Sequence, residues 1–135
     1  MGYERYRDWL DEACDDYGAA EALHGLGKYG KACFLSHQAC EKALKALLIK
    51  KLNRYESIHS AAELLRRAGG AVGVPEELLR KAEHLDRFYI PTRYPNAWPS
   101  GAPHKHYTRD DAEVALKYAK DVMDFVKGEI ERNPS

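Results

Sequence analysis

The sequence of 135 residues has few cysteines, no long apolar run and no excess of either charge. Its three cysteines, Cys14, Cys33 and Cys40, form an odd set without C-x-x-C spacing, so neither a disulfide framework nor a cysteine zinc cluster is indicated. Nowhere do about 18 apolar residues follow one another, and the N-terminal residues are charged, so no membrane span and no secretory signal is predicted. We therefore expect a cytoplasmic protein that does not contact a membrane.

The balance of charge narrows the possible ligands. Lys and Arg number 21, as do Asp and Glu, and this neutrality rules out a bulk coat of nucleic acid but leaves room for a local basic patch. The chain also lacks G-x-x-x-x-G-K-[ST], G-x-G-x-x-G and G-x-S-x-G motifs, so kinase, dehydrogenase and hydrolase functions have no support. His104 and His106 are spaced like metal ligands, but no further ligand is signalled. We expect no metal ion and no cofactor.

The spacing of apolar residues predicts an all-α fold in one domain, residues 1–135. Apolar positions recur at three- and four-residue steps, and no segment alternates as a strand does. Hydrophobic residues make up 44% of the chain, enough for one core. Helices are expected over 3–23, 28–52, 60–68, 75–88 and 108–131. Three long helices and a broken pair give an up-and-down four-helix bundle with one extra short helix.

Short sequence patterns predict where several helices begin and which of their faces point inward. Ser60 and Glu63 have the spacing of a capping box, as do Thr108 and Asp111 at the start of the last helix. The first helix is expected to carry an acidic outer face that includes Asp16. The inward-facing residues predicted for the second and last helices are Ala32, Leu35, Ala39, Ala43, Ala46, Leu47, Ala112, Ala115, Ala119, Val122, Val126 and Ile130.

Residues 89–107 form a long loop that holds four of the six prolines, and a loop of that length in a compact domain is usually functional. Arg93 offers a guanidinium group and Asn96 an amide. Flat aromatic rings lie beside them in the sequence, a combination used for nucleotide phosphates and unstacked bases. In the alternative interpretation the aromatic residues only dock the loop, and Arg93 pairs with Asp86. The aromatic residues concerned are Tyr89, Tyr94 and Trp98.

A second group of candidate ligand-binding residues lies along one ridge of the second helix. Gln38, Lys42 and Lys45 follow one another at three- and four-residue steps and offer an amide and two ammonium groups. The alternative is a solvated face with a Glu41–Lys45 ion pair. His37, beside the apolar stripe, is expected to be half-buried and bonded within the protein.

Four segments, SHQACEKALKALL, IHSAAELL, FYIPTRYPN and YTRDDAEVALKYAKDVMDFV, resemble the HEPN domain family (higher eukaryotes and prokaryotes nucleotide-binding). The likeness covers nearly the whole chain, and the RYPN loop with its spacing to the last helix is its most specific part. The resemblance implies a four-helix bundle that commonly forms a homodimer. It also implies, as in many prokaryotic members, a partner nucleotidyltransferase in a toxin–antitoxin pair.

Many members of that family are metal-independent ribonucleases with an Arg-x4–6-His motif. Here Arg93 lies where the motif arginine is expected, but His104 follows after ten intervening residues and His106 after twelve. Arg54 and His59 do have four residues between them, yet they fall in the turn after the second helix, and we interpret this as a chance match.

Three functional hypotheses follow. The leading one is a HEPN dimer that binds a nucleotide or RNA through Arg93, Tyr94 and Asn96, together with the ridge of Gln38, Lys42 and Lys45. The second is a metal-independent endoribonuclease that uses Arg93 with His104 or His106, brought together in a dimer cleft. The third is a non-catalytic docking subunit for the nucleotidyltransferase.

Overall fold

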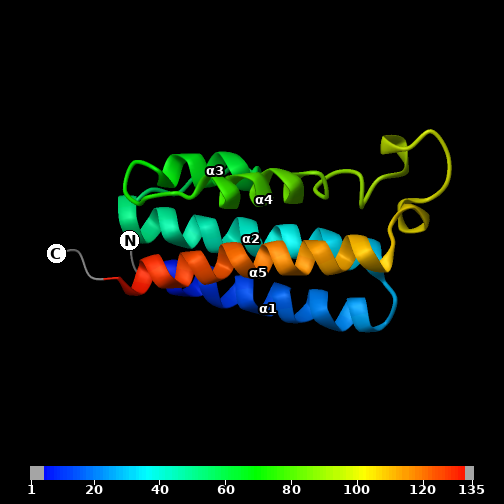
Figure 1. Ribbon diagram of the computed structural model, residues 1–135, viewed down its shortest axis with the longest axis horizontal. Coiled ribbons are helices and arrows are strands. Elements are labelled where there is room, and N and C mark those ends of the chain that lie inside the picture. The colour runs from blue at the N-terminus through cyan, green and yellow to red at the C-terminus, as the bar shows by residue number, and fades with distance from the viewer. Residues whose placement is uncertain (1–4, 133–135) are drawn as a thin grey trace.

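The computed structural model describes residues 5–132, and every regular element in that range is helical (Figure 1). This confirms the all-α prediction. The elements are α1 (Tyr6–Gly25), α2 (Tyr29–Leu52), α3 (Ala61–Ala68), α4 (Glu76–Asp86), two short 3₁₀ turns η1 (Pro95–Ala97) and η2 (Pro103–His106), and α5 (Arg109–Glu131). The expected start of the first helix at Tyr3 lies outside the described residues.

Helix α2 is the centre of the molecule. It has no proline and is rich in alanine and leucine, which favours an uninterrupted helix of 24 residues. In Figure 1, α1 and α5 run along it on one side, while α3 and α4 lie on the other. Leu44, Leu47 and Leu48 are fully buried. The predicted inward residues of α2 and α5 are buried too, apart from the partly buried Leu35 and Ile130.

Helices α3 and α4 form the broken fourth member of the bundle. Asn53, in the left-handed conformation with φ of 49°, ends α2. The segment 53–60 then runs without regular structure to the start of α3. The backbone N–H of Ala61, the first residue of α3, bonds to Asp86, the last residue of α4, so the two helices are antiparallel. The loop after α4 therefore starts beside the beginning of α3.

One prediction for the face of α1 is wrong. Asp16 is expected on the acidic outer face, but it is only 7% exposed, because Lys42 of α2 reaches it at 2.9 Å. The helical spacing puts Asp16 one position from the apolar stripe, and periodicity does not indicate whether a cation lies on the neighbouring helix. The ion pair makes burial of this carboxylate tolerable.

The caps of α3 and α5 differ. At α5 both halves of the predicted box are present: the Thr108 hydroxyl accepts from Asp111 N, and the Asp111 carboxylate accepts from Thr108 N. At α3 the Ser60 hydroxyl accepts from Glu63 N as predicted, but the Glu63 carboxylate pairs with Arg66 and Arg67 instead.

Candidate nucleic-acid interface

Arg93 lies in a cradle of three aromatic rings, which we call the Arg93 cradle. Its Cζ is 4.8 Å from the ring centroid of Phe34 on α2, 4.6 Å from that of Tyr89 and 4.9 Å from that of Tyr94. Its Nε donates a hydrogen bond of 2.8 Å to the Tyr89 carbonyl oxygen. Within residues 5–132 no carboxylate pairs with Arg93. The cradle therefore fixes the guanidinium group and leaves its charge without a counter-ion.

The alternative pairing of Arg93 with Asp86 is wrong. The Asp86 carboxylate accepts hydrogen bonds from the Ser60 hydroxyl and from the backbone N–H groups of Ala61 and Ala62, and it lies 2.9 Å from Nε2 of His37. Burial raises the pKa of Asp86, but these four contacts outweigh it and hold the pKa below its ordinary value. The carboxylate is thus bonded to α2 and to the start of α3, and within residues 5–132 no ion pair joins it to Arg93. His37 is bonded within the protein as expected, although fully rather than half-buried.

The rest of the loop is docked on itself, whereas the alternative interpretation has its aromatic residues dock the loop onto the bundle. The rings of Trp98 and His106 stack at 3.9 Å with an interplanar angle of 2°, and Trp98 Nε1 donates to the Pro91 carbonyl oxygen at 2.7 Å. His106 Nε2 contacts the Ser100 carbonyl oxygen at 2.8 Å. Tyr94 differs, because 49% of its surface is exposed. Asn96 is exposed as well.

The predicted ridge on α2 is turned into the protein. Gln38 Nε2 donates to Asp16 at 3.3 Å, and Lys42 pairs with the same carboxylate. Lys45 is 3% exposed and pairs with Glu41 at 2.9 Å. The expected Glu41–Lys45 pair is thus present, but it is buried rather than solvated. Among residues 5–132 no hydrogen bond or ion pair joins Gln38, Lys42 or Lys45 to Arg93.

His59, interpreted from its spacing to Arg54 as a chance match, lies beside the Arg93 cradle. Its Nδ1 lies 3.1 Å from the Glu41 carboxylate, and its side chain is 52% exposed. Its ring stacks on Tyr89 at 5.0 Å, so His59 and Arg93 contact the same ring. Arg54 pairs with Glu56 instead. No local pattern indicates this grouping, because its members come from α2, the 53–60 segment and the loop after α4.

His104 lines a pocket that does not include Arg93. This pocket, of about 380 Å³, lies at the α1–α2 turn, and we call it the turn pocket. No contact within the described chain joins His104 or His106 to Arg93. The residues that line the turn pocket are Leu26, Gly27, Lys28, Tyr29, Gly30, Lys31 and His104.

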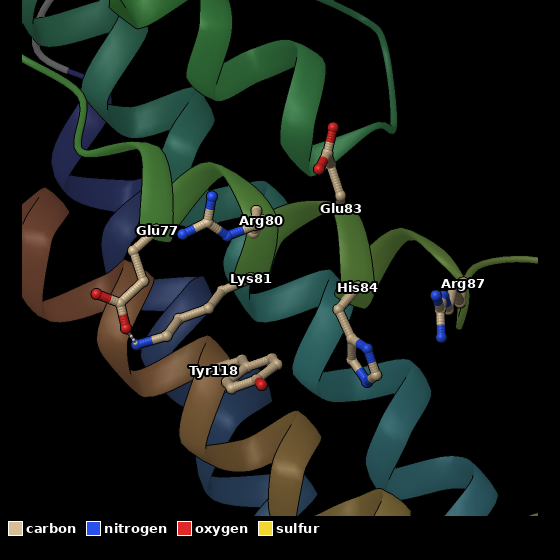
Figure 2. A pocket seen from close by; sticks show the side chains of 7 residues that line it. All are labelled: Glu77, Arg80, Lys81, Glu83, His84, Arg87 and Tyr118. Atoms are coloured by element: carbon tan, nitrogen blue, oxygen red, sulfur yellow. Dashed lines mark ion pairs between the residues drawn. The ribbon is translucent and has the colours of Figure 1, made fainter.

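A pocket of about 510 Å³ between α4 and α5 has a different character (Figure 2). Figure 2 shows Lys81 between Glu77 and Tyr118, and Lys81 also pairs with Asp121 at 2.8 Å. Other charged groups of its lining are paired too: Arg80 with Glu76, and Glu83 with Arg66. Most charges of this pocket are paired within the protein. It therefore attracts an anion less strongly than the Arg93 cradle does.

Glu12, Asp15 and Asp16 hold three carboxylate oxygens within 4.8 Å of one another on α1. Lys42 already reaches both Asp16, at 2.9 Å, and Glu12, at 3.9 Å. The lysine ammonium therefore supplies the positive charge that a metal ion would bring.

A helical bundle with a proline-rich loop before its last helix defines the class of protein, and comparison with known sequences gives the family. The model of the HEPN domain matches residues 6–129, and the chain belongs to this family. None of the described helices is long and apolar enough to cross a membrane.

Solved structures agree with this assignment. The protein TT1696 from Thermus thermophilus is 43% identical, with a TM-score of 0.90 over 93% of this chain and 98% of that one. ST0689, an archaeal HEPN homologue, is 35% identical, with a TM-score of 0.79 over 94% and 98%. A HEPN domain protein from Thermotoga maritima is 32% identical, with a TM-score of 0.75 over 93% and 99%.

A curated relative from Methanocaldococcus jannaschii bears the name "Putative toxin MJ1304". It is 27% identical over 128 residues, which cover 88% of this chain and 84% of that protein.

Proposed function

We propose that this HEPN protein binds RNA through the Arg93 cradle, with Tyr94 and Asn96 as further contacts, and that it acts as a toxin-like partner of a nucleotidyltransferase. The observation that carries the proposal is the guanidinium group of Arg93, fixed by three rings and one hydrogen bond without a carboxylate partner in residues 5–132. A guanidinium group held in this way favours the binding of an anion, because the arginine side chain loses little further entropy when the anion binds.

The chemistry of the cradle fits a nucleotide unit. Nε of Arg93 is used by the protein, but the two terminal nitrogens remain as a fork for a phosphate. Tyr94 is half-exposed beside it and offers a face on which a base can stack, a contact worth about 1–3 kcal/mol. The amide of Asn96 adds a donor and an acceptor for a base edge.

The role in a toxin–antitoxin pair is supported by the family and by the name of the Methanocaldococcus relative. A homodimer and a nucleotidyltransferase partner are parts of the same proposal. Co-expression with a nucleotidyltransferase encoded beside its gene, followed by light scattering, tests both: the expected result is a complex that contains two copies of this chain. A monomer that does not bind the nucleotidyltransferase contradicts this part.

Binding itself is tested by fluorescence anisotropy with a labelled single-stranded RNA. Arg93→Ala should weaken binding about tenfold or more, since it removes the charged contact to a phosphate. The matched control is Arg80→Ala, which removes the same charge from an arginine paired with Glu76. Equal affinities of wild type and Arg93→Ala, or equal losses in both variants, would overturn the proposal.

Metal-independent RNA cleavage is a second candidate, and the grouping of His59 with Glu41 favours it. The carboxylate at Nδ1 orients the imidazole, which leaves Nε2 to take the proton of a ribose 2′-hydroxyl. The resulting oxyanion attacks the adjacent phosphorus, the P–O5′ bond breaks, and the leaving 5′-oxygen takes up a proton from water, while Arg93 stabilises the charge of the transition state. The products are a 2′,3′-cyclic phosphate and a 5′-hydroxyl end.

Cleavage is tested with end-labelled tRNA in EDTA. Discrete fragments from wild type that disappear in His59→Gln but persist in His106→Gln would establish this site. Fragments lost only in His104→Gln or His106→Gln would assign cleavage to the pair expected from the sequence. An absence of fragments with wild type would contradict cleavage and leave binding as the function.

A further inference from the structure

We propose that the turn pocket is a second phosphate site, so that the ligand of this protein is an RNA strand rather than a single nucleotide. This inference rests on the proposed RNA binding at the Arg93 cradle. It assigns the pocket lined by Lys28, Lys31 and His104 to the phosphate that neighbours the nucleotide held by Arg93.

The charge of the turn pocket is the first argument. Two lysines and a histidine line it, and no carboxylate does. Glu113, a carboxylate near this end of the bundle, is 3.6 Å from His24. Two uncompensated ammonium groups at one concave surface favour an anion there. Neither pocket lysine pairs with an acidic side chain among residues 5–132, in contrast to Lys42, Lys45, Lys81, Lys117 and Lys120.

The pocket is built into the fold. Gly30 allows η2 to approach α2, since a Cβ at this position would lie 3.2 Å from the Tyr107 ring and 3.7 Å from Cα of His104. The η2 turn thereby places His104 opposite the lysines. Gly27, with φ of 77°, makes the tight turn that puts Lys28 at the start of α2. The pocket lining, which contains no carboxylate, thus combines residues from two segments that lie far apart in the sequence.

The position of the turn pocket relative to Arg93 is the second argument. Phe34, whose ring contacts Arg93, follows Lys31 by three residues on α2. Residues at this spacing are neighbours on a helix surface, with an axial separation of about 5 Å. His104 and Arg93 belong to the same loop. A strand that stacks a base on Tyr94 and places a phosphate on Arg93 can therefore continue onto Lys31 and Lys28 without leaving this end of the bundle.

The test compares affinities for a uridine dodecamer and for uridine monophosphate, with the full chain. The double variant Lys28→Ala/Lys31→Ala should bind the dodecamer about tenfold more weakly. The slope of log affinity against log salt should fall by about 0.7, because the pocket neutralises one phosphate and each phosphate neutralised on a single strand contributes about 0.7. The affinity of this variant for the monophosphate should not change. The control variant Lys117→Ala/Lys120→Ala removes the same charge from the middle of α5 and should bind the dodecamer like wild type.

Every other outcome of this binding experiment would contradict the inference. If the lysine variant binds the dodecamer like wild type while Arg93→Ala does not, the turn pocket binds no phosphate and the cradle alone binds RNA. Equal losses in both double variants would mean that net charge, not the pocket, sets the affinity. If wild-type protein binds neither ligand, both this inference and the proposed function fail.

Discussion

At the residue scale, Asp86 joins three elements through one carboxylate. It satisfies the first two N–H groups of α3, accepts from Ser60 and holds the buried ring of His37. Because the carboxylate is ionised, His37 donates from Nε2, and Nδ1 is a buried atom without a hydrogen-bond partner in the described residues. The loop that carries Arg93 begins directly after Asp86, so this carboxylate also positions the candidate site.

Replacing Asp86 with alanine should lower the free energy of unfolding by about 3 kcal/mol, since the variant lacks both a helix cap and the buried partner of His37. The folded-state pKa of Asp86 lies below 3.8, so its contribution is fully present above that value and is lost as the pH falls through the folded pKa. Urea titrations at several pH values should therefore show the difference between wild type and the variant shrinking below pH 4. A difference in stability that does not change with pH would contradict this role. The control is Asp124→Ala, which removes an exposed carboxylate paired with Lys120.

The three cysteines should differ in reactivity. Burial raises the pKa of Cys33 to about 12 and that of Cys40 well above its ordinary value, whereas Cys14 is exposed. Since the thiolate is the reactive form, a thiol reagent should label one cysteine per native chain and three per unfolded chain. Rapid labelling of two or more cysteines in the native protein would contradict the burial of α2.

At the element scale, the helices and their caps were predictable, and the polar contacts between different elements were not. The positions of α1 to α5 follow from periodicity, proline and caps, all of which act within a few residues. Asp86 reaches a helix start 25 residues away, and Lys42 reaches Asp16 on another helix. Such pairs depend on how helices are placed side by side. The sequence could therefore group Arg93 with Tyr89 and Tyr94 in the loop before α5, but it could not add Phe34 and His59 from other segments.

The start of α5 depends on its capping box. Thr108→Ala should lower the free energy of unfolding by about 1 kcal/mol, because the Asp111 N–H loses its acceptor. Thr108→Ser keeps a hydroxyl and should cost only a few tenths of a kcal/mol. Thermal or urea unfolding measures both. Equal stabilities of the alanine variant and wild type would show that packing, rather than the cap, holds this end of the helix.

At the scale of the whole molecule, a net charge of zero coexists with an uneven distribution of charge. Many lysines and arginines of the bundle pair with carboxylates on their own or a neighbouring helix. Within residues 5–132 Arg93, Lys28 and Lys31 do not; Lys28 and Lys31 line the turn pocket together with His104, which belongs to the same loop as Arg93. The proposed RNA binding therefore uses one end of the HEPN bundle and does not require a generally basic surface.

The most direct test of this account is a titration of the isotope-labelled protein with single-stranded RNA, followed by two-dimensional NMR. The account predicts the largest shifts at Arg93, Tyr94 and Asn96, with accompanying shifts at Lys28 and Lys31. Shifts confined to the α4–α5 pocket of Figure 2, or no shifts at saturating RNA, would contradict it.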